Sequence, residues 1–181
     1  MKFSKMSYAN TYLVNIIKSC CLIYGRCKKF ISKQEIITFA YTQQDGTVND
    51  RTVKPIAMMF SKYYLYIIGF MADYSKNFPT IFRIDRIANL IVTKQHFNIL
   101  YKDKFNDGEF RKRVQFMYSG ELQRVTFEFS GPYSEVVLDR IPTAEIISDK
   151  DGVYKICAEV YGNGIQMLLR SQGDWIKNID L

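Results

Sequence analysis

The strongest constraint on the fold is a series of five short β-rich runs, separated by tight turns, between residues 34 and 97. The most strand-like run is YYLYIIGF, residues 63–70, which follows a two-residue connection at Ser61-Lys62. β-Branched and aromatic residues favour strands because their side chains pack well on a pleated surface. Short strands leave unpaired edges unless their sheet closes, so we predict a five-stranded barrel of the Sm or SH3 type over residues 34–97.

The C-terminal part of the chain shows a second alternation of strands and helices. The predicted elements are, in order, a strand at 125–129, a helix at 133–140, strands at 145–148 and 153–161, a helix at 164–171 and a strand at 175–179. This β-α-β-β-α-β order predicts a ferredoxin-like module over residues 121–181. Residues 98–120 are charged and irregular, and we interpret them as a partly helical linker that carries the basic cluster Arg111-Lys112-Arg113.

Residues 1–33 are predicted to form an N-terminal amphipathic helix that begins near Thr11. Apolar residues recur there at three- and four-residue spacing, from Leu13 through Cys20 and Cys27 to Ile31. The predicted fold class is therefore α+β and mainly β. Because an apolar stripe must be buried, we expect this helix to join two copies of the chain into a homodimer.

Positive charge is concentrated toward the N-terminus. The chain has a net charge of +7, and residues 1–33 carry seven Lys or Arg and no acid. An anionic partner should therefore meet the N-terminal half of the chain. The alternative is a solvated helix face, which is the commoner meaning of scattered lysines.

Several functional classes find no support in the sequence. No apolar run approaches the roughly 18 residues of a membrane span, so we expect no membrane partner. The four cysteines have neither disulfide-framework nor zinc spacing, which favours a cytoplasmic protein without a metal site. His96 is the only histidine and has no suitably spaced nucleophile or acid, so we predict no catalytic residue, no cofactor and no enzyme. Gly162-Asn163-Gly164 precedes a predicted helix and could bind phosphate, although a plain loop is the simpler interpretation.

The candidate ligand-binding residues lie in the predicted barrel and are Arg51, Tyr64, Arg83 and Arg86. Strand alternation places Phe82 inside the barrel and Arg83 outside, and Arg86 lies in the turn just beyond. A planar guanidinium binds phosphate oxygens in bidentate fashion, and a neighbouring tyrosine ring stacks on a base. Spacing alone equally allows Arg83 and Arg86 to pair with Asp85 or Glu35 and to serve only the fold.

Motifs in this order resemble the WYL domain family. Tyr63-Tyr64-Leu65 stands in the place of the Trp-Tyr-Leu triplet that names the family, with Tyr63 replacing the tryptophan. Arg51-Thr52-Val53-Lys54-Pro55-Ile56 is similar to the family's R-x-V-x-P stretch, and Phe82-Arg83-Ile84-Asp85-Arg86-Ile87 is similar to its F-R-L-D-R-I motif. Residues 116–181 resemble the C-terminal extension that often follows a WYL domain.

The resemblance implies an Sm- or SH3-like barrel that acts as a ligand sensor in bacterial transcription regulation. Members of the family usually follow a helix-turn-helix, and single-stranded nucleic acids or nucleotides are associated with them as ligands. By this resemblance the four candidate residues occupy ligand-facing positions. Because residues 1–33 are too few for a winged helix-turn-helix, we expect a separate DNA-binding domain or partner protein. The alternative function is a non-catalytic dimerisation or protein-interaction module, or an accessory protein of a phage-defence system, in which the arginines are structural.

Overall fold

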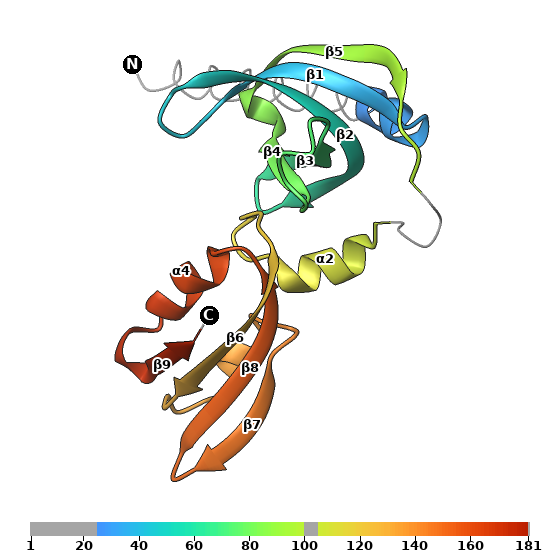
Figure 1. The fold of residues 1–181 in the computed structure, drawn as a ribbon. Helices are drawn as coiled ribbons and strands as arrows, with labels where there is room; N and C mark the ends of the chain where they lie inside the picture. The colour runs from blue at the N-terminus through green and yellow to red at the C-terminus, as the bar shows by residue number, and fades with distance from the viewer. Residues whose placement is uncertain (1–24, 100–104, 181) are drawn as a thin grey trace, which may run out of the picture. The chain divides into compact units, whose positions relative to one another are not determined.

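The chain forms two compact units, one around a five-stranded sheet and the other around a four-stranded sheet. This computed structural model describes residues 25–99 and 105–180 (Figure 1). Within those ranges both sheets are antiparallel and the helices are short, with none longer than eight residues. The predicted class, α+β and mainly β, is therefore confirmed.

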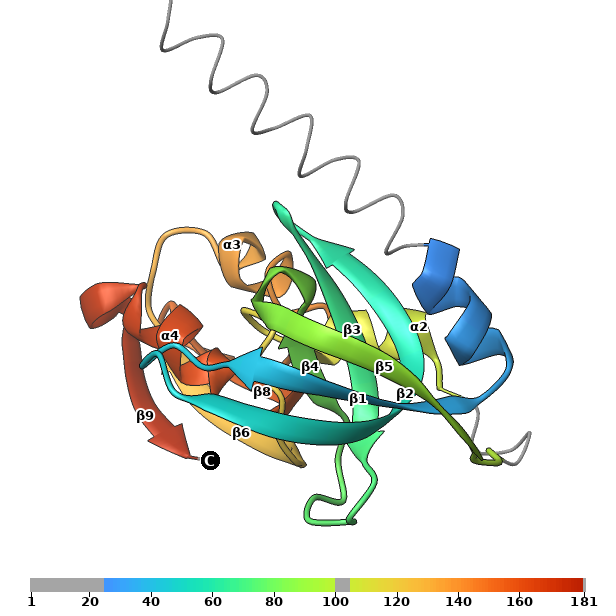
Figure 2. The same cartoon turned by 90° about the horizontal axis from the view of Figure 1, so that it is seen from above.

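The first sheet has the strand order β4-β3-β2-β1-β5. Its strands are β1 (Glu35–Thr42), β2 (Val48–Ser61), β3 (Tyr64–Met71), β4 (Thr80–Arg83) and β5 (Ile87–His96). The sheet is strongly curved (Figure 2), and the short 3-10 helix η1 (Ile84–Arg86) joins its two outermost strands, β4 and β5. Curvature combined with this connection gives the small Sm- or SH3-like barrel that the five β-rich runs predict.

The core of the first unit fills the concave side of the curved sheet. Buried side chains come from β1, β2, β3, β4 and η1, namely Ile37, Phe39, Val53, Ile67, Met71, Phe82 and Ile84, and β5 packs partly buried side chains against them. Strand alternation explains the set, because Ile37 and Phe39 face the core from β1 while their register partners Val53 and Arg51 lie on the same side of β2.

The helix at residues 25–32 packs against this core. Cys27 and Phe30 are fully buried with the barrel side chains, and Ile31 is partly buried against them. This end of the predicted amphipathic stripe is therefore covered by the chain's own barrel rather than by a second copy. The rest of the predicted helix, residues 11–24, lies outside the described residues.

The second unit has the strand order β7-β8-β6-β9. Its elements are α2 (Asp107–Arg113), β6 (Leu122–Phe129), α3 (Glu135–Leu138), β7 (Glu145–Lys150), β8 (Val153–Tyr161), α4 (Gly164–Arg170), the 3-10 helix η3 (Gly173–Trp175) and β9 (Ile176–Asp180). From β6 onward this is the β-α-β-β-α-β order, and placing the first strand between the third and the last gives the ferredoxin-like arrangement. The two helices are shorter than predicted, since α3 has only four residues and α4 has seven.

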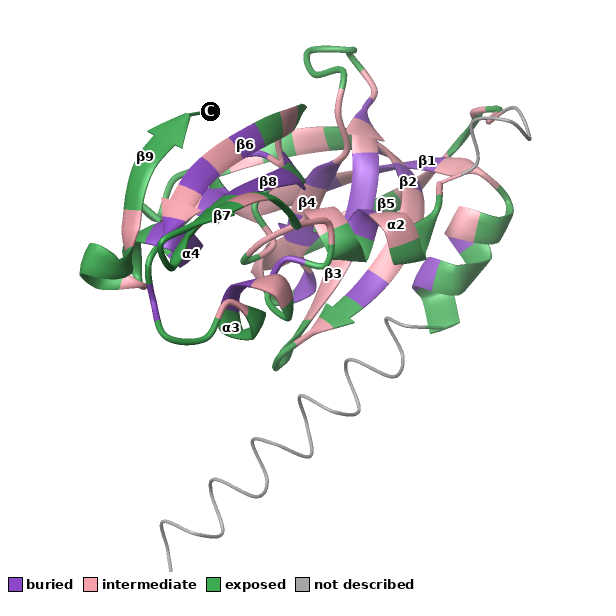
Figure 3. Cartoon of the chain, turned by 90° about the horizontal axis from the view of Figure 1, so that it is seen from below, coloured by how far each residue is buried: buried purple, intermediate pink, exposed green. Residues whose placement is uncertain are grey.

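One face of the second sheet carries the core of this unit. Buried residues alternate along β6 (Figure 3). With buried residues of β8 they meet α3 and α4 in a single cluster, of which Phe127, Ile156 and Leu169 are fully buried members. The opposite face presents polar side chains, including Glu128 and Lys155 at paired positions. Antiparallel sheets commonly pack one face against a core and expose the other face to solvent.

The glycine-rich run before α4 is explained by close backbone packing. A Cβ atom at Gly120 would lie 2.3 Å from the Cα of Gly162, and one at Gly164 would lie 2.1 Å from the carbonyl oxygen of Gln115. The Asn163 side chain makes no capping hydrogen bond to α4. These approaches favour the interpretation of the run as a tightly packed loop rather than as a phosphate site.

Candidate ligand-binding site

Arg83 and Tyr64 form a stacked pair on the outer face of the barrel. Phe82 is buried in β4, so alternation turns the next side chain, Arg83, to the opposite face. Tyr64 begins the neighbouring strand β3, and the guanidinium carbon of Arg83 lies 3.5 Å from the centre of its ring. This cation–π contact fixes the position of the guanidinium against the sheet.

Asp85 binds the free edge of the same guanidinium. The Nε of Arg83 donates to Oδ1 of Asp85 at 3.0 Å, and Nη2 donates to Oδ2 at 2.6 Å. This bidentate pair raises the pKa of Arg83. The Arg83 side chain is 23% exposed and that of Asp85 is 52% exposed, so the pair lies at the surface with the carboxylate outermost. The sequence also allowed a structural role in which Arg83 pairs with Asp85, and this ion pair is present.

A rigid aromatic cluster supports the backbone on which Arg83 stands. The rings of Phe39, Tyr41 and Phe82 meet edge to face, with both Phe39 and Tyr41 at 5.2 Å from Phe82. The hydroxyl oxygen of Tyr41 also accepts a hydrogen bond from the backbone N–H of Arg83 at 3.3 Å. Buried aromatic packing therefore holds the β4–η1 junction in place.

The other two arginines occupy different positions. Arg86 is the last residue of η1, and Arg83 is the extended residue that precedes this helix. Among the described residues, no carboxylate forms an ion pair with Arg86. Arg51 is paired in register with the buried Phe39, so it lies on the core side of the sheet. The structure therefore brings together Arg83 and Tyr64, leaves Arg86 at the end of η1, and places Arg51 on the core face of the sheet.

A loop acid lies near Arg51 instead. The carboxylate of Asp73 accepts a hydrogen bond from the backbone N–H of Ser75 at 3.0 Å. This bond is the main cause of a lowered pKa of Asp73, and the charge of Arg51 adds to it. Arg51 thus acts electrostatically on an acid of the β3–β4 loop.

Comparison with known families agrees with the motifs on these strands. Residues 23–92 match the WYL domain family. The chain contains a WYL domain. The match begins before β1, so it includes the helix at residues 25–32 and ends within β5. It supports a regulatory sensor domain as the general class of function.

A solved structure with a similar chain trace is proteasome accessory factor B/C (PafBC) of Arthrobacter aurescens. The two chains share 16% sequence identity with a TM-score of 0.43 over 85% of this chain, which spans 24% of the PafBC chain. No curated protein matches the sequence significantly. No helix within the described residues is long and apolar enough to cross a membrane.

Sequence reasoning missed two exposed aromatic residues close to Tyr64 on the β2–β3 hairpin. Phe60 and Tyr63 flank the Ser61-Lys62 turn between β2 and β3 and are 61% and 88% exposed. Tyr64 is 40% exposed, with one ring face occupied by Arg83. The signal available in the sequence was an aromatic residue on each side of a polar two-residue turn, where a hairpin tip leaves side chains in solvent.

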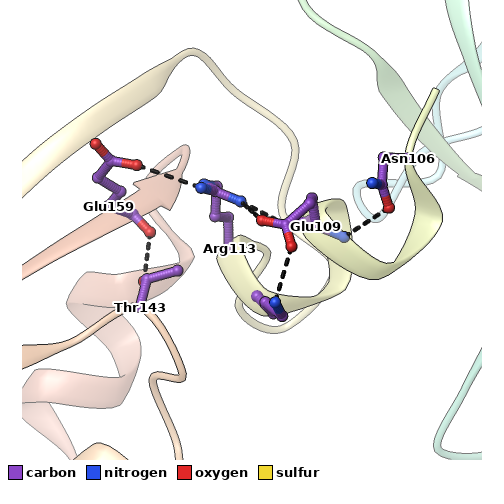
Figure 4. A network of polar contacts seen from close by, with 6 residues as sticks. Asn106, Glu109, Arg113, Thr143 and Glu159 are labelled. Carbon is purple, nitrogen blue, oxygen red and sulfur yellow. Dashed lines mark hydrogen bonds and ion pairs between the residues drawn. The ribbon is translucent and has the colours of Figure 1, made fainter. Parts of the chain in front are cut away.

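The basic cluster of α2 is neutralised by acids of its own unit. The Glu109 carboxylate pairs with Lys112 at 2.8 Å and with Arg113 at 2.5 Å, and Arg113 also lies 3.4 Å from Glu159. Figure 4 shows Arg113 between Glu109 and Glu159. These cations lower the pKa of Glu109 to about 2, with the hydrogen bond from Lys112 as the largest cause. Arg111 pairs with Asp107 at 3.2 Å. Arg111-Lys112-Arg113 is therefore not an open cationic patch, because each of its three cations pairs with a carboxylate.

We expect the double substitution Arg111→Gln with Lys112→Gln to change oligonucleotide affinity by less than about threefold, because both cations already have carboxylate partners. Fluorescence anisotropy with a labelled single-stranded oligonucleotide measures the effect. A tenfold loss would assign the ligand-binding surface to α2 instead of the barrel.

A small apolar pocket lies on the core side of η1. It has a volume of about 160 Å³ and is lined by Arg26, Cys27, Phe30, Ile84, Ile87 and Leu90. Burial raises the pKa of the Cys27 thiol to about 11, so this thiol is neutral at physiological pH and contributes as an apolar group. The pocket lacks the stacked guanidinium of the outer face, which is the better candidate for an anion.

Proposed function

We propose that this chain is the ligand-sensing part of a WYL-type transcription regulator and that it binds single-stranded nucleic acid or a nucleotide-like anion. Arg83 and Arg86 would bind phosphate, Tyr64 would hold Arg83 in place, and Arg51 would contribute from the other face of the sheet. The observation that carries the proposal is the Arg83 guanidinium stacked 3.5 Å above Tyr64 on the outer face of the barrel. A pre-positioned guanidinium loses little freedom when it binds an anion.

Exposed aromatic rings complete the chemistry of such a site. Tyr63 is 88% exposed on the hairpin that leads into Tyr64, so its ring is available for stacking on a base. Phosphate contacts would supply most of the affinity. Stacking of bases on aromatic rings would add affinity that depends little on the base sequence. We further propose that the protein acts in the cytoplasm as a homodimer and works with a separate DNA-binding domain or partner.

The test is the double substitution Arg83→Ala with Arg86→Ala, measured by fluorescence anisotropy on a short single-stranded oligonucleotide. Loss of two charge-assisted phosphate contacts should weaken binding by about a hundredfold. The slope of log K against log salt should fall by about 1.4.

A matched control removes the same charge from the second unit. Arg140→Ala with Arg170→Ala affects two exposed arginines outside the barrel and should leave the affinity within about threefold of the wild type. Wild-type affinity in the Arg83/Arg86 variant would refute the proposed arginine site.

The second candidate function is a non-catalytic interaction module with structural arginines. It is favoured by the bidentate ion pair between Arg83 and Asp85, which a purely structural role would also produce. In that case the Arg83/Arg86 variant unfolds at a lower temperature and elutes from heparin at the same salt concentration as the wild type.

A further inference from the structure

The small apolar pocket on the core side of η1 is built by two parts of the first unit. Cys27 and Phe30 line it from the helix that precedes β1. Ile84, Ile87 and Leu90 line it from η1 and β5. Ile87 and Leu90 are partly exposed, whereas the other three side chains are buried. The pocket therefore has an apolar floor in the core and reaches the surface of the unit.

The size and lining of the pocket suit one small ring. Its volume of about 160 Å³ is close to the roughly 150 Å³ of apolar protein cavities that bind benzene. No amide, hydroxyl or carboxylate side chain lines it, and the neutral Cys27 thiol acts as an apolar group. A bound ring would also remove the exposed parts of Ile87 and Leu90 from water, which is favourable.

Arg26 adds a single positive charge at the edge of this pocket. It is the exposed residue of the lining, and no carboxylate of the described residues forms an ion pair with it. Burial raises the pKa of the Cys27 thiol, and the charge of Arg26 acts in the opposite direction, so this charge is felt at the pocket wall. A guanidinium without a carboxylate partner can bind a carboxylate of a ligand in bidentate fashion.

We propose that this pocket binds a small aromatic carboxylate, with its ring against Phe30 and Leu90 and its carboxylate on Arg26. The ligand is mainly apolar and carries one charge, so it differs in class from the phosphates proposed for the outer face of the barrel. The proposal does not depend on nucleic-acid binding. Because such a ligand has only about ten non-hydrogen atoms, its dissociation constant should be on the order of 0.1–1 mM.

The test is a titration of the isotopically labelled full chain with phenylacetate, followed by the backbone amide shifts of the pocket residues in two-dimensional NMR. These shifts should saturate with a dissociation constant in the stated range. Two related probes separate the ring from the charge, since acetate lacks the ring and 2-phenylethanol lacks the carboxylate. Acetate should give no saturable shift up to about 20 mM, and 2-phenylethanol should bind about three- to tenfold more weakly than phenylacetate.

Substitutions on each side of the pocket test the two contacts separately. Arg26→Gln should bind phenylacetate and 2-phenylethanol equally, because it removes only the charge of an exposed residue. Lys29→Gln is the matched control, since Lys29 is an exposed cation of the same helix that does not line the pocket, and it should keep the wild-type preference. Leu90→Phe should weaken both ligands at least about fivefold by filling the pocket, with its melting temperature measured as a check on folding.

Three results would overturn the inference. The first is a titration in which the pocket residues show no saturable shift, and the second is equal binding of phenylacetate and 2-phenylethanol by the wild type. The third is an unchanged preference for phenylacetate in Arg26→Gln, which does not depend on whether Leu90→Phe folds. None of these measurements involves an oligonucleotide, so each of these results would leave the proposed function intact.

Discussion

Replacing Phe127 with alanine is expected to destabilise the ferredoxin-like module by about 3–5 kcal/mol while oligonucleotide binding to the barrel persists. Phe127 is fully buried at the centre of β6, where the sheet meets the helices of the second unit. Removing its ring loses the transfer free energy of the apolar atoms and leaves a cavity that the short helices cannot fill. All of the proposed binding residues lie in the first unit, so their geometry should survive.

The measurement is chemical denaturation followed by the fluorescence of Trp175, the single tryptophan, which lies 6.4 Å from the Phe129 ring of the same core. Leu122→Ala is the control, because Leu122 lies on the same strand but is 52% exposed. Its cost should stay below about 1 kcal/mol. Loss of oligonucleotide binding in Phe127→Ala at a denaturant concentration where the barrel is folded would show that binding requires the second unit.

Much of the fold could be predicted from the sequence because short strands carry a simple alternation. Val125, Phe127 and Phe129 alternate with polar residues, and all three face the core of the second unit. The same rule placed Phe82 inside the barrel and Arg83 outside, which the structure confirms. Helix lengths were less accurate, since α3 spans only four of the eight residues predicted and is stabilised by its place on the sheet rather than by its own sequence.

The candidate site was harder to predict because it depends on which strands are neighbours. Alternation gives the face on which Arg83 lies, but only the pairing of β3 with β4 brings Tyr64 beneath its guanidinium. Arg51 belongs to another of the family's motifs, and its register partner Phe39 shows that it lies on the core side. The neutralised cluster of α2 could have been predicted, since Asp107 and Glu109 each precede an arginine by four residues.

Phe82→Ala should have the corresponding large effect on the first unit, a destabilisation of about 3–5 kcal/mol. Phe82 is 3% exposed and holds the edges of Phe39 and Tyr41 against the strand that carries Arg83. Thermal unfolding followed by near-ultraviolet circular dichroism of the tyrosines measures the loss.

A second substitution in β4 gives the control of opposite sign. The hydroxyl oxygen of Thr80 is buried and has no hydrogen-bond partner among the described residues, so Thr80→Val removes an unsatisfied polar group and should stabilise the chain by up to about 1 kcal/mol.

In Phe82→Ala, oligonucleotide affinity should fall together with the tyrosine signal, because the β4–η1 junction that orients Arg83 loses its support. Wild-type affinity in a Phe82→Ala protein whose tyrosine signal has collapsed would show that the Arg83 site does not depend on this aromatic cluster.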